Sequence, residues 1–134
     1  MRILVDTSVW IDFLNDYPSQ EQETLAGLLA GDDEICTCGV ILTEVFQGLR
    51  RERGRKAFEA LFRELTFLEL AGMDPYFRAA ELYRTLRQGG VTARSTIDCL
   101  IAITAELGGC RLLARDRDMT AIARSGLLQG FLLL

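Results

Sequence analysis

The sequence predicts an α/β layer fold with a largely parallel sheet of about four to five strands flanked by helices. Short apolar, β-prone runs alternate along the chain with longer segments of helical periodicity. The 134 residues, 49% of them hydrophobic, are enough for one domain with a two-layer or three-layer core. Acidic residues follow two of the apolar runs, at the edge where open parallel sheets bind ligands. Residues 1–134 are therefore expected to form a single domain.

The predicted strands are short and apolar. Residues 3–5 read Ile-Leu-Val, and the second run alternates in the manner of a strand that is buried on one face. The runs are residues 3–5, 34–38, 67–70, about 111–114 and about 128–133. Because helical segments separate them, consecutive strands are expected to run parallel.

Capping residues and glycines set the limits of the predicted helices. Thr7 or Ser8 can cap the first helix, and Ser19 begins the second. Asp74-Pro75 is the most specific start signal, with Asp as N-cap and Pro at the first helical position. The predicted helices are residues 9–14, 19–30, 40–51, 55–65, 74–89, 95–108 and 119–124.

Four carboxylates stand in apolar surroundings: Asp6, Glu44, Asp98 and Asp116. Asp6 and Asp116 end two strand-like runs, and Asp98 interrupts a helix that is otherwise apolar almost all round. A buried carboxylate is costly unless it is paired, hydrogen-bonded or bound to a metal. If these groups converge, a hard divalent cation held by oxygen ligands is the natural occupant.

Each carboxylate also has a structural alternative. Asp6 could be a helix N-cap, and Asp98 could answer Ser95 in a capping box. Asp116 could be a turn residue, but Asp118 is the better placed cap, which predicts that Asp116 points toward the site and Asp118 caps or lies outside it.

Glu44 is the weakest of the four by pattern. It falls off the apolar stripe of its helix, so periodicity alone predicts that it faces solvent. The remaining acids, including Asp12 and Glu106, are expected at caps, in turns or on solvated faces, without a chemical role.

The charge is unevenly distributed within a net charge of −4. Residues 1–49 hold one basic and nine acidic residues, whereas residues 50–134 hold fourteen basic and ten acidic ones. All basic residues except Lys56 are arginine, whose planar fork suits phosphate recognition. The densest cluster of basic residues comprises Arg50, Arg51, Arg53, Arg55 and Lys56. A solvated helix end explains this cluster as well as phosphate recognition does.

Histidine is absent from the sequence. Its absence excludes histidine-based acid–base cleavage of RNA and Ser-His or Cys-His nucleophilic catalysis. Cys36, Cys38, Cys99 and Cys110 lack zinc-ligand spacing, so reduced, buried thiols in a cytoplasmic protein are expected. The chain shows neither a secretory leader nor an apolar run long enough to span a bilayer, so no membrane association is expected.

Four segments, taken in order, resemble PIN domains and specifically VapC-type toxins. These segments are residues 3–11, 42–48, 98–102 and 112–119. The resemblance implies a PIN-like three-layer fold and a metal-dependent ribonuclease. It also implies that the acidic set is Asp6, Glu44, Asp98 and Asp116 and that the Ser8 hydroxyl helps to order the site. Ala114 replaces the usual threonine two residues before the fourth acid, and Met119 replaces the usual aromatic residue after Asp118.

The resemblance implies hydrolysis of RNA phosphodiester bonds with Mg²⁺ or Mn²⁺ as cofactor. Asp6, Asp98 and Asp116 are the first candidates as metal ligands, and Glu44 is a candidate for holding a water or a second ion. The implied partners are RNA, a cognate VapB-type antitoxin and a second copy of the chain, the toxin acting in a type II toxin–antitoxin pair.

Two alternatives belong to other classes. A non-cleaving PIN-like module would bind metal or a partner without hydrolysing RNA. A receiver-like signalling domain would need adjacent acids near the first strand and a lysine late in the chain. Here Thr7-Ser8 follows Asp6, and the sole lysine, Lys56, lies in a helical region, which disfavours the receiver.

An apolar helical surface is a candidate for docking the antitoxin, although core packing explains most of its residues better. The residues are Trp10, Phe13, Phe46, Leu49, Phe58, Leu61 and Phe62.

Overall fold

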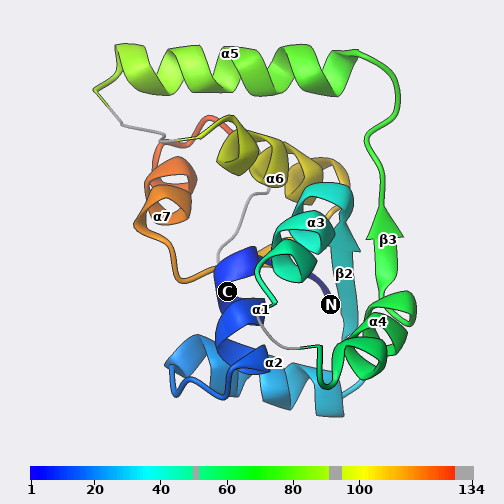
Figure 1. The fold of residues 1–134 in the computed structure, drawn as a ribbon. Coiled ribbons are helices and arrows are strands. Elements are labelled where there is room, and N and C mark those ends of the chain that lie inside the picture. The colour runs from blue at the N-terminus through cyan, green and yellow to red at the C-terminus, as the bar shows by residue number, and fades with distance from the viewer. Residues whose placement is uncertain (50–51, 91–94, 129–134) are drawn as a thin grey trace.

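Four parallel strands form the centre of the computed structural model, which describes residues 1–49, 52–90 and 95–128 (Figure 1). The strands are β1 (Arg2–Val5), β2 (Glu34–Cys38), β3 (Thr66–Leu68) and β4 (Arg111–Leu113). They are ordered β3-β2-β1-β4, and every neighbouring pair is parallel. The predicted parallel α/β fold is confirmed, while a strand near residues 128–133 falls almost wholly outside the described residues.

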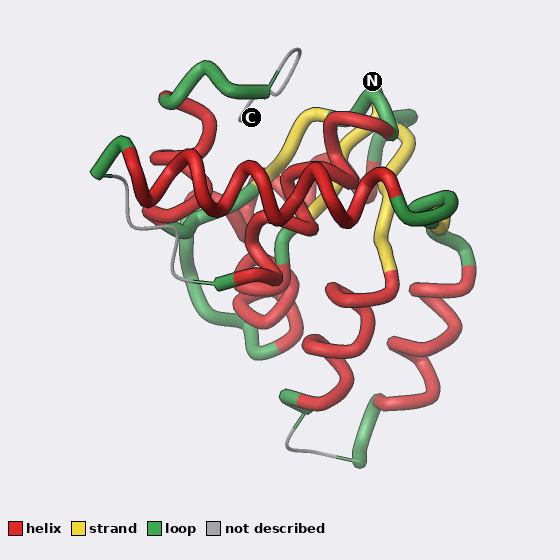
Figure 2. Tube along the Cα trace, turned by 90° about the horizontal axis from the view of Figure 1, so that it is seen from above, coloured by secondary structure: helices red, strands yellow, loops and turns green. Residues whose placement is uncertain are grey.

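Helices cover both faces of this sheet. They are α1 (Thr7–Leu14), α2 (Gln20–Ala30), α3 (Gly39–Gln47), α4 (Arg55–Arg63), α5 (Asp74–Gln88), α6 (Thr96–Leu107) and α7 (Arg117–Arg124). The connections from β1 to β2 and from β2 to β3 cross the sheet in one direction, and the connection from β3 to β4 runs back in the other. Because such connections are right-handed, α1–α4 lie on one face of the sheet and α5–α6 on the opposite face. The packing agrees, because α1 contacts α2 and α3 while α6 contacts α5 and α7. Figure 2 shows the long α5 crossing in front of the strands.

The core is built on β1 and α6. Ile3, Leu4 and Val5 are fully buried, as expected for a central parallel strand covered on both faces. Residues 101–105 of α6 are also buried, which explains why this helix is apolar almost all round. All four cysteines are buried and free, as predicted. Within the described ranges, no helix has both the length and the apolar character needed to cross a bilayer.

Two helices have a residue at the N-cap position other than the one predicted. Helix α1 begins at Thr7 with Asp6 at the N-cap position, so neither Thr7 nor Ser8 caps it. Helix α5 begins at Asp74 with Met73 at the N-cap position, so the prediction of Asp74 as cap is wrong. Asp74 instead lies in the first turn, where the helix dipole favours an acidic side chain.

Two serine caps occur as predicted. The Ser19 hydroxyl accepts a hydrogen bond of 3.0 Å from the Gln22 amide at the start of α2. The Ser95 hydroxyl accepts one of 3.1 Å from the Asp98 amide at the start of α6. The second cap fixes the first turn of the helix that carries Asp98.

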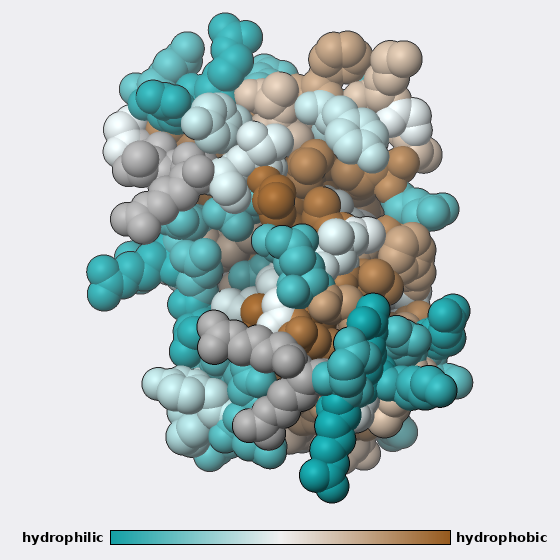
Figure 3. All heavy atoms as spheres, viewed as in Figure 1, coloured by the Kyte–Doolittle hydropathy of each residue, from teal (hydrophilic) through white to brown (hydrophobic). Residues whose placement is uncertain are grey.

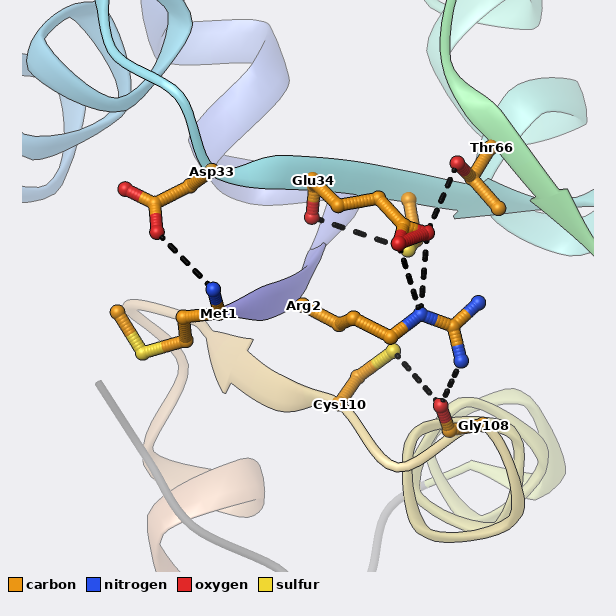
Figure 4. A network of polar contacts seen from close by, with 8 residues as sticks. Met1, Arg2, Asp33, Glu34, Thr66, Gly108 and Cys110 are labelled. Carbon is orange, nitrogen blue, oxygen red and sulfur yellow. Dashed lines mark hydrogen bonds and ion pairs between the residues drawn. The ribbon is translucent and has the colours of Figure 1, made fainter.

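A polar network closes the amino edge of the sheet (Figure 4). Arg2 Nε lies 3.0 Å from a Glu34 carboxylate oxygen, and Thr66 donates to the same oxygen at 3.1 Å. Arg2 also donates to the Gly108 carbonyl, and the amino terminus pairs with Asp33. The network joins β1, β2 and β3 to the end of α6, at the edge opposite Asp6.

Candidate active site

The carboxyl edge of the sheet brings acidic residues together from distant parts of the chain. Val5 and Leu113 are partners at the ends of β1 and β4, and the Asp6 amide donates to the Leu113 carbonyl at 2.9 Å. Asp6 therefore lies beside the segment that leads to Asp116. Helices α3 and α6 contact each other and supply Glu44 and Asp98.

Asp98, Asp116 and Asp118 form the tightest acidic group. One carboxylate oxygen from each residue lies within 4.8 Å of the other two. Asp116 is the N-cap of α7, because its Oδ1 accepts a 2.9 Å hydrogen bond from the Asp118 amide. The prediction that Asp118 caps the helix is therefore wrong, whereas the predicted placement of Asp116 toward the site agrees with its position in this group. Capping through Asp116 starts the helix at Arg117 and holds the Asp118 side chain beside Asp98.

Asp6 is 5% exposed and belongs to the same electrostatic cluster, although it is not one of these three. The pKa of its carboxyl is raised to about 6, chiefly by burial and also by the charges of Asp98 and Asp116, while hydrogen bonds from the Thr7 backbone and from Ser8 act in the opposite direction. The Ser8 hydroxyl donates to Asp6 Oδ2 at 3.3 Å. Ser8 thus orients the Asp6 carboxylate.

Asp98 is half-buried and is also held in an unfavourable charged state. The pKa of its carboxyl is raised to about 6, chiefly by burial and also by the charges of Asp116, Asp118 and Glu44, whereas a hydrogen bond with Ser95 lowers it. Asp98 is therefore part of the cap of α6 and of the cluster at once, so the two sequence-based alternatives for it are compatible.

Glu44 lies at the side of the cluster and does not face solvent freely. Its Oε1 accepts a 2.7 Å hydrogen bond from the Thr7 hydroxyl, and the residue is partly buried. The prediction that Glu44 faces solvent is wrong, because α1 packs against α3 and brings Thr7 to the Glu44 side chain. Sequence reasoning placed Thr7 only as a cap and missed this contact.

This arrangement fits a divalent cation. Three carboxylate oxygens lie close enough together to share one ion, and every candidate ligand is a hard oxygen donor. The raised pKa values of Asp6 and Asp98 express burial and mutual repulsion, which a bound cation would relieve.

Asp12 was expected on a solvated face or in a turn, and the structure buries it instead. The residue is 5% exposed, and its Oδ2 lies 3.1 Å from both Arg115 Nη1 and the Ser19 hydroxyl. No local pattern in the sequence could indicate this, because Arg115 lies near the other end of the chain.

Comparisons with known proteins agree with this geometry. Residues 3–125 match the family model described as PIN domain. Ribonuclease VapC11 of Mycobacterium tuberculosis is 34% identical over 129 residues, covering 96% of each chain. In fold, the chain is similar to VapBC2 from Rickettsia felis bound to a promoter DNA fragment, with a TM-score of 0.71 at 19% identity, covering 100% of this chain and 98% of that one. It is equally similar to VapBC-1 from nontypeable Haemophilus influenzae, with a TM-score of 0.71 at 17% identity and coverage of 100% and 97%. This chain therefore belongs to the PIN-domain family, among the VapC ribonucleases.

Proposed function

We propose that this protein is a Mg²⁺-dependent endoribonuclease that hydrolyses RNA phosphodiester bonds and acts as the toxin of a type II toxin–antitoxin pair. The observation that carries the proposal is the convergence of Asp6, Asp98, Asp116 and Asp118 at one edge of the sheet, with Glu44 beside them. The 34% identity to a VapC ribonuclease supports RNA as the substrate.

In the proposed site, Asp98, Asp116 and Asp118 would hold the cation, and Asp6 lies at the buried side of the cluster. When bound, Mg²⁺ or Mn²⁺ would neutralise charge on the phosphate and lower the pKa of a water for in-line attack. The Ser8 hydroxyl orients Asp6. Glu44, fixed by Thr7, is placed to orient the attacking water or to hold a second ion.

Replacing single carboxylates tests this proposal. Asp6→Asn and Asp98→Asn should each lower Mg²⁺-dependent cleavage of a fluorogenic RNA by at least about a hundredfold, because each removes charge that the cation needs. Asp33→Asn is the matched control, since Asp33 pairs with the amino terminus at the opposite edge of the sheet. Circular dichroism checks that each variant folds.

Full activity in either site variant would refute the assignment. Metal binding without cleavage of any RNA would instead favour the non-cleaving metal-binding or partner-binding module. Equal loss of activity in Asp33→Asn would point to general destabilisation.

The outer face of α7 is proposed to hold the RNA backbone. Arg117, Thr120, Arg124 and Ser125 line an open groove on this helix, and both arginines are exposed. The first turn of the same helix carries Asp118, so the groove begins next to the carboxylate cluster. Guanidinium and hydroxyl groups are the usual contacts to phosphate.

Salt dependence tests this groove. Arg117→Ala/Arg124→Ala should weaken RNA binding and lower the slope of log K against log salt by about one to two, because up to two phosphate contacts are lost. Arg84→Ala/Arg87→Ala removes two exposed arginines from α5 and is the control. An unchanged slope in the α7 variant would place the RNA elsewhere.

A second groove is proposed to bind the antitoxin. It has a volume of about 670 Å³, and its lining combines an apolar floor with charged residues. The lining residues are Leu42, Phe46, Arg55, Glu59, Phe62, Arg63, Leu65 and Phe67. The similar solved structures are described as VapBC complexes, which supports a VapB-type partner here.

The structure revises the residues predicted for this surface. Trp10 is fully buried and its ring lies 4.6 Å from that of Phe62, so core packing is the correct account of Trp10.

Phe67→Asp should abolish co-purification with a co-expressed antitoxin while RNA cleavage persists. Retained co-purification would contradict docking in this groove.

A further inference from the structure

Asp12 forms an ion pair with Arg115, the residue that directly precedes Asp116 of the proposed metal site. The Asp12 side chain is 7% exposed, and its Oδ2 lies 3.1 Å from Arg115 Nη1. The Ser19 hydroxyl donates to the same oxygen at 3.1 Å. The pair therefore joins α1, the N-cap of α2 and the segment between β4 and α7.

A second contact holds the same guanidinium. Arg115 Cζ lies 5.8 Å from the centre of the Tyr17 ring, within the range of a cation–π interaction. The Tyr17 amide donates to the Asp12 carbonyl at 2.8 Å, so Asp12 also helps to place the ring. Asp12 and Tyr17 together fix the direction of the Arg115 side chain.

The position of Arg115 makes this restraint important. It directly precedes Asp116, whose carboxylate lies within 4.8 Å of those of Asp98 and Asp118. A free arginine so close to several carboxylates would be drawn to them, since a guanidinium pairs readily with carboxylate oxygens. It would then neutralise the cluster and occupy the oxygens that a divalent cation needs.

We propose that Asp12 is a positioning residue that keeps the Arg115 guanidinium off the carboxylate cluster and so leaves the cluster free to bind a divalent cation. The inference rests on the proposed function, in which this cluster binds a cation, but its test measures binding without reference to RNA cleavage.

Calorimetric titration with Mn²⁺ tests the proposal through a double-mutant cycle. Asp12→Asn should bind Mn²⁺ about twofold to fivefold more weakly, the effect expected when one partly exposed charge interaction forms at the site. Asp12→Asn/Arg115→Met should regain the wild-type affinity, because the competing cation has been removed. Arg115→Met alone should bind Mn²⁺ at least as tightly as the wild type.

Glu106→Gln is the matched control. The Glu106 side chain is also 7% exposed and pairs with an arginine, Arg78, whose exposure of 42% is close to the 45% of Arg115. It lies at the opposite end of α6 from Asp98. Its affinity for Mn²⁺ should equal that of the wild type, because its arginine is not adjacent to the cluster.

Tyr17→Ala serves as a second variant if Asp12→Asn fails to fold. Tyr17 is 55% exposed, so its truncation removes the support under the guanidinium with little effect on the core. A smaller loss of Mn²⁺ affinity is expected, again reversed by Arg115→Met. Circular dichroism without metal monitors the fold of every variant.

Three results would overturn the proposal: wild-type affinity in the folded Asp12→Asn or Tyr17→Ala variant, no recovery in the double variant, or an equal loss in Glu106→Gln. If the wild type binds no Mn²⁺, both this inference and the proposed function fail. If the wild type binds Mn²⁺ and cleaves RNA while Asp12→Asn binds as tightly, only this inference fails.

Discussion

At the scale of single residues, Asp6 and Asp98 combine burial with proximity to other acids. The pKa of each carboxyl is raised to about 6, with burial as the largest cause. The ionised site is therefore maintained at a cost in stability. Unfavourable burial and repulsion of this kind are typical of functional sites, where a ligand of opposite charge relieves them on binding.

This burial and repulsion predict a pH dependence of stability. Because the pKa of Asp6 in the folded state lies above its unfolded value of 3.8, the folded state binds more protons than the unfolded state between about pH 4 and 6. Stability from this group is fully present below pH 4 and is lost as the pH rises through 6, by about 3 kcal/mol. Asp98 acts in the same direction.

Thermal unfolding in chelator at pH 4.5 and 7.5 measures this effect, and Asp6→Asn should reduce the difference. Mn²⁺ binding near pH 6 should release protons, detectable by titration in buffers of different ionisation enthalpy. A metal-free protein whose stability rises between these pH values would contradict the assignment.

The Thr7–Glu44 hydrogen bond predicts a second effect at this scale. Thr7→Val keeps the shape of the side chain but removes the donor to Glu44 at 2.7 Å. RNA cleavage should fall about tenfold, the equivalent of one hydrogen bond to a charged group, while the Mn²⁺ affinity of the Asp98, Asp116 and Asp118 group stays unchanged. Thr43→Val is the control, since the Thr43 hydroxyl bonds only within α3, to the Gly39 carbonyl. Wild-type activity in Thr7→Val would show that RNA cleavage does not require the Thr7 hydroxyl to orient Glu44.

At the scale of elements, local capping rules explain much of the structure. The caps of α2 and α6 are the serines that the sequence indicates. The predicted start of α7, Met119, is two residues later than the observed start, Arg117. Asp116 and Asp118 could both cap this helix, and the local sequence does not decide between them. Asp116 takes the cap because the chain leaving β4 presents it to the Asp118 amide.

The cap of α6 has a testable consequence. Ser95→Ala removes the acceptor for the Asp98 amide and should cost about 1 kcal/mol of stability. It should also weaken Mn²⁺ binding, because the first turn that carries Asp98 is no longer fixed. Urea denaturation and calorimetric titration measure the two effects. Thr24→Ala, on α2, should leave Mn²⁺ affinity unchanged, and equal weakening in both variants would contradict the argument.

At the scale of the whole molecule, an apolar face lies away from the carboxylate cluster. Met73, Tyr76 and Phe77 at the start of α5 are 74%, 52% and 68% exposed. Figure 3 shows apolar residues gathering on this side of the molecule. Exposed apolar patches commonly mark protein interfaces, so this face is where the predicted homodimer would form.

Light scattering tests this face. Phe77→Asp should shift the protein from dimer to monomer, because a buried carboxylate at the interface is costly. Ala26→Asp on α2 adds the same charge at an exposed position elsewhere and should leave the mass unchanged. A dimer that persists in Phe77→Asp would place the interface on another surface.

Apolar periodicity and caps are local signals, and they were enough to predict the order of the elements, the parallel sheet and the positions of Asp6 and Asp116 after two of its strands. Tertiary structure alone decided which acids approach each other. It grouped Asp118 with Asp98 and Asp116, turned Glu44 toward Thr7 and buried Asp12 against Arg115. These contacts join segments far apart in the chain, and the packing of α1, α3 and α7 around the sheet sets their distances, which no local pattern records.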